Sequence, residues 1–85
     1  MVVGKIMFKD PADINKFVNI VSKKDYDVDV KDGSTVLDGK SLQGLFAMQL
    51  NKKLVCVLHE SIDKCHDIID QLAEFSIESF AEVAK

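Results

Sequence analysis

The stretch Gly39-Lys-Ser-Leu-Gln-Gly-Leu-Phe-Ala-Met-Gln-Leu50 decides how the rest of this 85-residue chain is interpreted. Ser41 follows a Gly-Lys turn and precedes apolar residues at helical spacing, Leu42, Leu45 and Phe46. This pattern predicts a helix with Ser41 as its N-cap, where the serine oxygen accepts a hydrogen bond from a backbone N–H two or three residues later. The helix should be short, because Asn51-Lys-Lys53 interrupts the apolar pattern. A structural cap is the simplest role for this serine.

Composition limits the classes of protein that the chain can belong to. Its length allows one domain. The net charge of −3 and a pI near 5.2 argue against nucleic-acid binding, since no basic cluster exceeds a pair of lysines. No apolar run approaches the ~20 residues of a membrane span, and the N-terminus lacks the layout of a signal peptide. We therefore expect a cytoplasmic protein whose two cysteines are reduced.

The first half of the chain predicts two strands, a helix and a hairpin. Residues 2–8 are apolar and β-branched and predict a strand. Asp10-Pro11 begins a helix that ends near Lys24, with Asp10 as N-cap and Pro11 at the first helical position. Tyr26, Val28 and Val30 alternate with polar residues over 26–31, which is typical of a strand with one solvent-exposed face. Asp32-Gly33 then predicts a hairpin turn before the Ser41 helix.

The second half predicts a central strand and a third helix. Residues 54–59 are apolar on both faces, as in a strand covered on both sides. Ser61 is the predicted cap of a helix whose buried stripe is Ile62, Cys65, Ile69, Leu72 and Ala73. Residues 76–85 carry a further apolar helical face that includes Ile77 and Phe80, so this tail should dock on the domain or on a second chain.

From Ser22 to Leu50 the sequence resembles the HPr family, the small phosphocarriers of the bacterial sugar phosphotransferase system. The resemblance lies in Ser22-Lys23, the alternating Asp-Val strand, a glycine hairpin, and Lys40-Ser41-Leu42 before a short helix. It implies an α+β, open-faced β-sandwich with the element order β-α-β-β-α-β-α. Four antiparallel strands would lie in the order 1-4-2-3, with three helices on one face. Residues 1–75 would form this domain, and residues 76–85 would be a short helical extension of it.

The phosphorylatable histidine of the family is missing from its expected position. In the family it stands just before helix one, in a His-Ala-Arg-Pro-Ala context. Here Phe8 stands at the histidine position and Asp10 at the arginine position, and the first histidine of the chain is His59. The chain therefore resembles the histidine-lacking, catabolite-repression type of HPr. We expect no catalytic residue and no enzymatic activity.

The regulatory serine of the family is matched by Ser41. The resemblance implies phosphorylation there by a dedicated serine kinase. The family's docking patch around this serine carries over to five residues of this chain, Lys40, Leu42, Gln43, Phe46 and Met48. A serine kinase or a transcription regulator would be the protein partner, and no cofactor is implied.

The two cysteines and two histidines of the chain could in principle form a zinc site. Cys56, His59, Cys65 and His66 do not have the spacing of a standard zinc finger. Cys56 and His59 are three residues apart on a predicted strand, so they should point to opposite faces. We expect no metal site, buried cysteines and exposed histidines.

Three hypotheses follow for function. The first is a non-enzymatic, HPr-like regulator or adaptor of the phosphotransferase system or of carbon catabolite control, with a partner-binding face around Ser41. The second is a structural or oligomerisation module that associates through residues 76–85. The third is a phosphocarrier that uses a residue other than histidine, and we rank it last.

Overall fold

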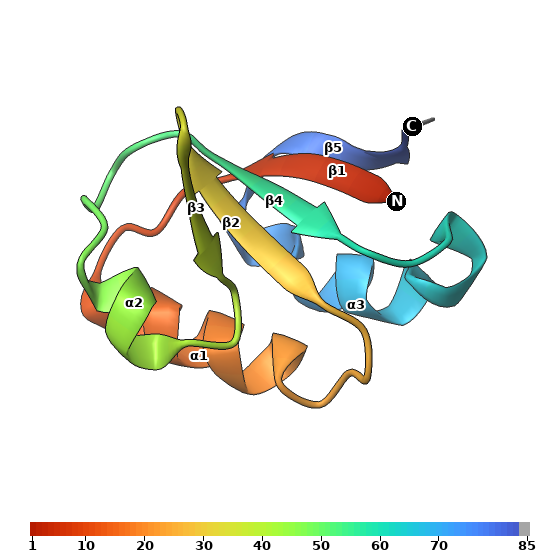
Figure 1. Ribbon diagram of the computed structural model, residues 1–85, viewed down its shortest axis with the longest axis horizontal. Helices are drawn as coiled ribbons and strands as arrows, with labels where there is room; N and C mark the ends of the chain where they lie inside the picture. The colour runs from red at the N-terminus through yellow and green to blue at the C-terminus, as the bar shows by residue number, and fades with distance from the viewer. Residues whose placement is uncertain (84–85) are drawn as a thin grey trace.

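One five-stranded antiparallel sheet organises the protein, and the computed structural model describes residues 1–83. The strands lie in the order β3-β2-β4-β1-β5, with β4 between β2 and β1 (Figure 1). Their bounds are β1 Val2–Ile6, β2 Val28–Asp32, β3 Thr35–Asp38, β4 Leu54–Leu58 and β5 Ser76–Glu82. The predicted order 1-4-2-3 is thus retained within a larger sheet.

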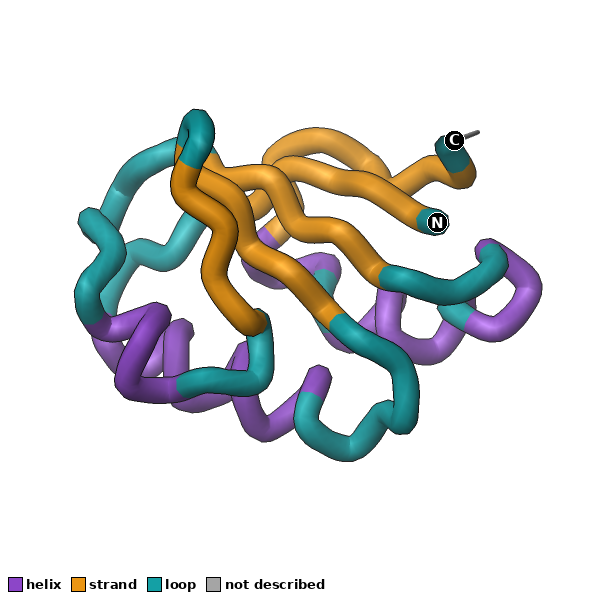
Figure 2. The backbone as a smooth tube through the Cα atoms, in the orientation of Figure 1, coloured by secondary structure: helices purple, strands orange, loops and turns teal. Residues whose placement is uncertain are grey.

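The helices of residues 1–83 cover one face of this sheet (Figures 1 and 2). They are α1 Pro11–Val21, α2 Leu42–Phe46 and α3 His66–Gln71, with two 3-10 turns, η1 Ile62–Lys64 and η2 Ala73–Phe75. The predicted start of α1 is confirmed, because the Asp10 carboxylate accepts a hydrogen bond of 3.2 Å from the Asp13 N–H. The predicted α+β class is confirmed as well.

The core lies between the sheet and the helices. Alternate residues of β1, β2 and β4 point into it, while their neighbours line the open face of the sheet. From α1, the buried face consists of Ile14, Phe17 and Val21. β4 contributes Leu54, Cys56 and Leu58 to the core and lies between β2 and β1, as predicted for a central strand.

The third helix begins later than predicted. The Ser61 side chain makes no cap hydrogen bond to the described residues, and residues 62–64 form the 3-10 turn η1. The Ile62 N–H, which a serine cap would leave for water, instead donates to the Glu82 carboxylate at 2.8 Å. α3 then begins at His66, after Cys65 breaks the turn with φ −109° and ψ 3°. The long-range contact from Glu82 therefore takes the place of a local cap.

The predicted helical extension is wrong, because residues 76–82 form β5 and pair with β1. The sheet consequently has five strands where four were expected. Phe80 packs against the core as expected, but Ile77 is 42% exposed and was predicted to be buried. Residues 84–85, also part of the predicted extension, lie outside the described residues.

Three interactions explain why this segment is a strand. Glu78 forms an ion pair with Lys5 of β1 at 3.2 Å, and Glu82 forms one with the N-terminal ammonium group at 2.9 Å. The Ile62 N–H and the N-terminal ammonium group lower the pKa of the Glu82 carboxyl, because each favours its charged form. The third interaction is the packing of the Phe80 ring on β1. A Cβ added at Gly4 would lie 2.6 Å from Cγ of Phe80, so the ring occupies the space that a side chain would fill.

No helix among residues 1–83 combines the length and the apolar character needed to cross a membrane.

We predict that Gly4→Ala lowers the free energy of unfolding by about 1–3 kcal/mol, because the new methyl group collides with the Phe80 ring. Phe80→Ala should also cost about 1–3 kcal/mol, through lost burial. In the Phe80→Ala background the Gly4→Ala change should be close to neutral, because its clash partner is gone. Urea denaturation of the four proteins measures this cycle. Additive losses would show that the ring does not occupy the space above Gly4.

Candidate functional site

The Ser41 cap is confirmed. Ser41 has extended backbone angles, φ −95° and ψ 101°, and its Oγ accepts a hydrogen bond of 3.1 Å from the Gly44 N–H. Leu45 is fully buried and attaches the helix to the core. α2 is only five residues long, as the interruption at residues 51–53 predicted. The half-buried Ser41 side chain therefore fixes the start of a helix that is anchored by one leucine.

Two parts can be distinguished in the predicted docking patch. Leu42 and Phe46 are 37% and 47% exposed, and Gln43 is exposed beside them. Met48 instead packs against the core and is only partly exposed. Lys40 extends away from the serine, and its Nζ donates a hydrogen bond of 2.7 Å to the Lys24 carbonyl oxygen. Residues 40–48 thus present an apolar surface beside Ser41, with one lysine tied to the end of α1.

Leu50 belongs to the same surface and was not predicted. It is 38% exposed, so three of the six exposed large apolar side chains within residues 1–83 lie on the short segment 42–50. The signal was present in the sequence, since Leu50 follows the helix at an interval of four residues from Phe46. We call Leu42, Phe46 and Leu50 the α2 apolar surface.

The structure places Phe8 in the core, where it is fully buried. Its ring meets those of Phe17 and Phe75 edge to face, at centroid distances of 5.3 and 6.0 Å. Asp10 is exposed and caps α1. The two positions that the resemblance aligns with the family's histidine and arginine are therefore a core residue and a helix cap, and neither carries an imidazole or a phosphate-binding cation.

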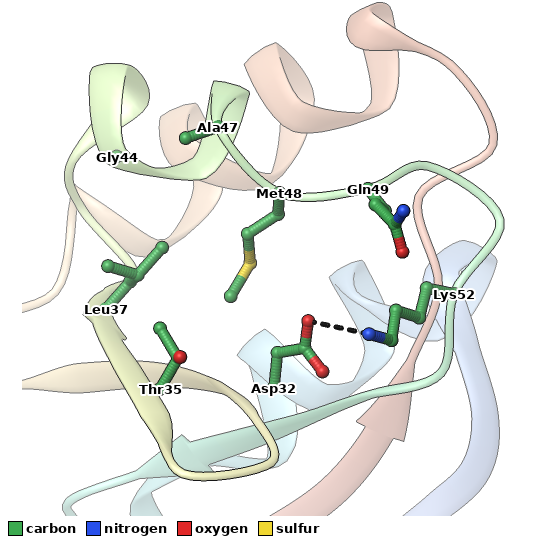
Figure 3. A pocket seen from close by; sticks show the side chains of 8 residues that line it. All are labelled: Asp32, Thr35, Leu37, Gly44, Ala47, Met48, Gln49 and Lys52. Carbon is green, nitrogen blue, oxygen red and sulfur yellow. Dashed lines mark ion pairs between the residues drawn. The ribbon is translucent and has the colours of Figure 1, made fainter.

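A pocket opens between α2 and the β2–β3 hairpin, and sequence reasoning missed it (Figure 3). Its volume is about 410 Å³. The Met48 side chain extends from the segment after α2 toward Thr35 and Asp32 of the hairpin (Figure 3). On one rim, Lys52 pairs with Asp32 at 3.0 Å. The complete lining is Asp32, Thr35, Leu37, Gly44, Ala47, Met48, Gln49 and Lys52.

The cysteines and histidines are separated as predicted. Cys56 is buried, and burial raises the pKa of its thiol to about 12. His59 lies on the open face of the sheet, where its Nε2 is 2.8 Å from the Asp29 carboxylate. Cys65 is buried, burial raises the pKa of its thiol too, and its neighbour His66 is exposed. Within residues 1–83 no three His, Cys, Asp or Glu side chains converge as the ligands of a metal ion would.

Comparison of the sequence with protein-family models and with curated proteins gives no significant match.

We predict that Ser41→Ala lowers the free energy of unfolding by about 1 kcal/mol, because the Gly44 N–H loses its acceptor. Ser61→Ala is the matched control, since Ser61 also precedes a helical turn but its side chain makes no cap bond to the described residues. That change should shift stability by less than about 0.5 kcal/mol. Equal losses in the two variants, measured by urea denaturation, would contradict the cap.

Proposed function

We propose that this protein is a non-enzymatic, HPr-like regulator or adaptor of the phosphotransferase system or of carbon catabolite control. It binds a protein partner through the face around Ser41, and a phosphate on that serine regulates the binding. The order 1-4-2-3 of β1 to β4, with the helices on one face, supports this proposal because it is the arrangement that the resemblance implies.

The α2 apolar surface is the observation that carries the proposal. A helix of five residues can bury only a few side chains, and here Leu45 alone is fully buried. Leu42, Phe46 and Leu50 keep a large part of their surface in water, which costs solubility and contributes little to the core. Apolar side chains clustered beside one modifiable hydroxyl group suit a regulated protein interface.

Phosphorylation of Ser41 would act on this surface through charge. The phosphate adds about −1.5 to −2 charges at neutral pH. In the chain it would stand directly before Leu42, five residues before Phe46, and directly after Lys40, whose Nζ is bound to the Lys24 carbonyl oxygen. Its main consequence would therefore be a change in which partner binds, with the fold retained.

We predict that Phe46→Ser abolishes binding of the partner protein, whereas Val36→Ser leaves this binding intact. Both residues are about half exposed, but Val36 lies on β3, outside the α2 apolar surface. The test is affinity capture from the native cell extract with wild-type protein and both variants, followed by a Kd for each captured protein. Ser41→Asp, which supplies a charge and retains a capping oxygen, should change the Kd of the same partner. A captured partner that binds the Phe46→Ser variant with the same Kd as the wild-type protein would contradict the proposal.

The protein should not accept phosphate from the general phosphotransferase enzyme. Phe8 has no lone pair to attack phosphorus, and Asp10 and Asp13 place carboxylates at the start of α1, where they repel a phosphoryl group. Transfer of labelled phosphate from phosphoenolpyruvate through the purified enzyme should leave the wild-type chain unlabelled.

Restoring the histidine alone should not create a phosphocarrier. Phe8→His places an imidazole in a fully buried aromatic cluster, which should cost about 3 kcal/mol or more and leave the ring out of reach of the enzyme. Adding Asp10→Arg should improve labelling more than Phe8→His does, because it removes a negative charge and supplies a bidentate phosphate donor. Efficient labelling of the single Phe8→His variant would refute the argument from burial and charge.

A structural or oligomerisation module is the second candidate, and β5 favours it. β5 is the outer strand beside β1, and Ile77 on it is 42% exposed. Sedimentation analysis separates the two candidates. A stable oligomer that forms without any partner favours the module, and a monomer favours the adaptor.

A further inference from the structure

We propose that the pocket between α2 and the β2–β3 hairpin receives an apolar side chain from an acidic segment of the partner protein. This inference rests on the proposed partner-binding function. It adds the place where the partner inserts and the chemistry of the inserted segment.

The pocket has the size and lining of an anchor site. Its volume of about 410 Å³ lies within the range of roughly 300–1,000 Å³ that binding pockets occupy. Leu37 of β3 and Met48 supply apolar lining, and the Met48 side chain extends from the segment after α2 toward the hairpin (Figure 3). Methionine adapts its shape to different apolar groups because its side chain is unbranched and polarisable. A leucine, methionine or phenylalanine side chain of a partner would pack against these two residues.

Gly44 of α2 lines the pocket without a side chain. Among the glycines of the described residues only Gly33 has a positive φ, so the backbone of α2 does not require glycine at position 44. Glycine inside a helix costs about 1 kcal/mol relative to alanine. A Cβ at this position would meet only the Ser41 side chain, with Oγ at 3.2 Å. The absent side chain thus leaves space around the Ser41 cap, at a cost to the helix, and adds no side chain to the pocket lining at this position.

The charge around the pocket favours a negatively charged partner. Residues 39–59 contain three lysines and no acidic residue, whereas the rest of the chain carries eight lysines and all 14 acidic residues. The segment that builds α2 and one side of the pocket therefore has a formal charge of +3, against −6 for the remainder. Lys52 stands on the rim, where it shares its charge with Asp32, and the exposed Lys53 follows it. The hairpin side of the pocket carries Asp32 and Asp38, and Lys40 is bound to the Lys24 carbonyl oxygen. A carboxylate beside the inserted side chain would therefore gain chiefly from Lys53. The positive segment would still steer it toward this side of an otherwise acidic protein.

The pocket is continuous with the α2 apolar surface. Ala47 and Met48, which line the pocket, directly follow Phe46 in the chain. Leu50 lies between the lining residues Gln49 and Lys52. One partner segment can therefore cover Phe46 and insert a side chain into the pocket.

The test is selection of a random twelve-residue displayed peptide library on the immobilised full chain. We expect enriched peptides that carry net negative charge and a large apolar residue. Ala47→Leu, which fills the pocket mouth, should weaken their binding by at least about tenfold, the loss typical of a displaced anchor. Ala73→Leu, the same change at an exposed alanine of η2, should have no effect. Amide NMR spectra verify that each variant is folded.

A charge reversal tests the acidic character independently. Lys52→Glu should abolish binding of the selected peptides, whereas Lys64→Glu, an equal change on the exposed 3-10 turn η1, should leave it intact. Enrichment of neutral or basic peptides, or no enrichment, overturns the inference.

The outcomes separate this inference from the proposed function. Peptides that are lost with Phe46→Ser but bind equally well to Ala47→Leu would overturn the pocket inference and leave the partner-binding face supported. The proposed function fails separately, when the captured native partner is indifferent to Phe46→Ser.

Discussion

Three phenylalanine rings, Phe8, Phe17 and Phe75, meet edge to face where the end of β1, the middle of α1 and the start of β5 come together. Edge-to-face pairs of this kind contribute about 0.5–1.5 kcal/mol each beyond their buried area. The backbone follows the same connection, since the Met7 N–H donates to the Phe75 carbonyl oxygen at 2.9 Å. This cluster commits position 8 to the core. The start of α1 is left to Asp10, whose carboxylate caps and stabilises the helix.

The short length of α2 likewise limits how many of its side chains can be buried. A helix of five residues is not stable by itself, so the Ser41 cap, the burial of Leu45 and the packing of α2 on α1 and β3 hold it in place. Few of its side chains can reach the core from such a short element. Its remaining apolar residues therefore face water, and the segment after it passes over the hairpin without closing the space beneath. Exposed apolar surface and pocket thus have one structural cause.

Local signals predicted most of this fold. The Asp10-Pro11 start, the alternating valines of β2 and the Ser41 cap each depend on neighbours in sequence, and each was predicted correctly. Residues 76–82 failed because Ile77, Phe80 and Ala81 fit a helical face as well as a strand. Gly4, Lys5 and the N-terminus decide between the two, and all of them are more than 70 residues away in sequence. The pocket was missed for a different reason: its lining residues all lie within residues 32–52, but only the packing of α2 on the hairpin brings them around one space.

The fifth strand also determines where partners can approach. Without it, β1 would be an outer strand with unpaired N–H and C=O groups, which invites pairing with other chains. β5 covers that edge, and its pairing with β1 shifts register twice, where extra residues of β5 interrupt the ladder. Such bulges bend an outer strand and disfavour further strand addition. Because the pKa of Glu82 is lowered in the folded protein, its ion pair and hydrogen bond stabilise the fold at neutral pH. This stabilisation is lost as the pH falls through the pKa of Glu82 in the folded protein. At neutral pH the irregular pairing and the Glu82 contacts therefore protect the β5 edge from strand addition, which fits the proposed approach of a partner to the α2 apolar surface better than association through β5.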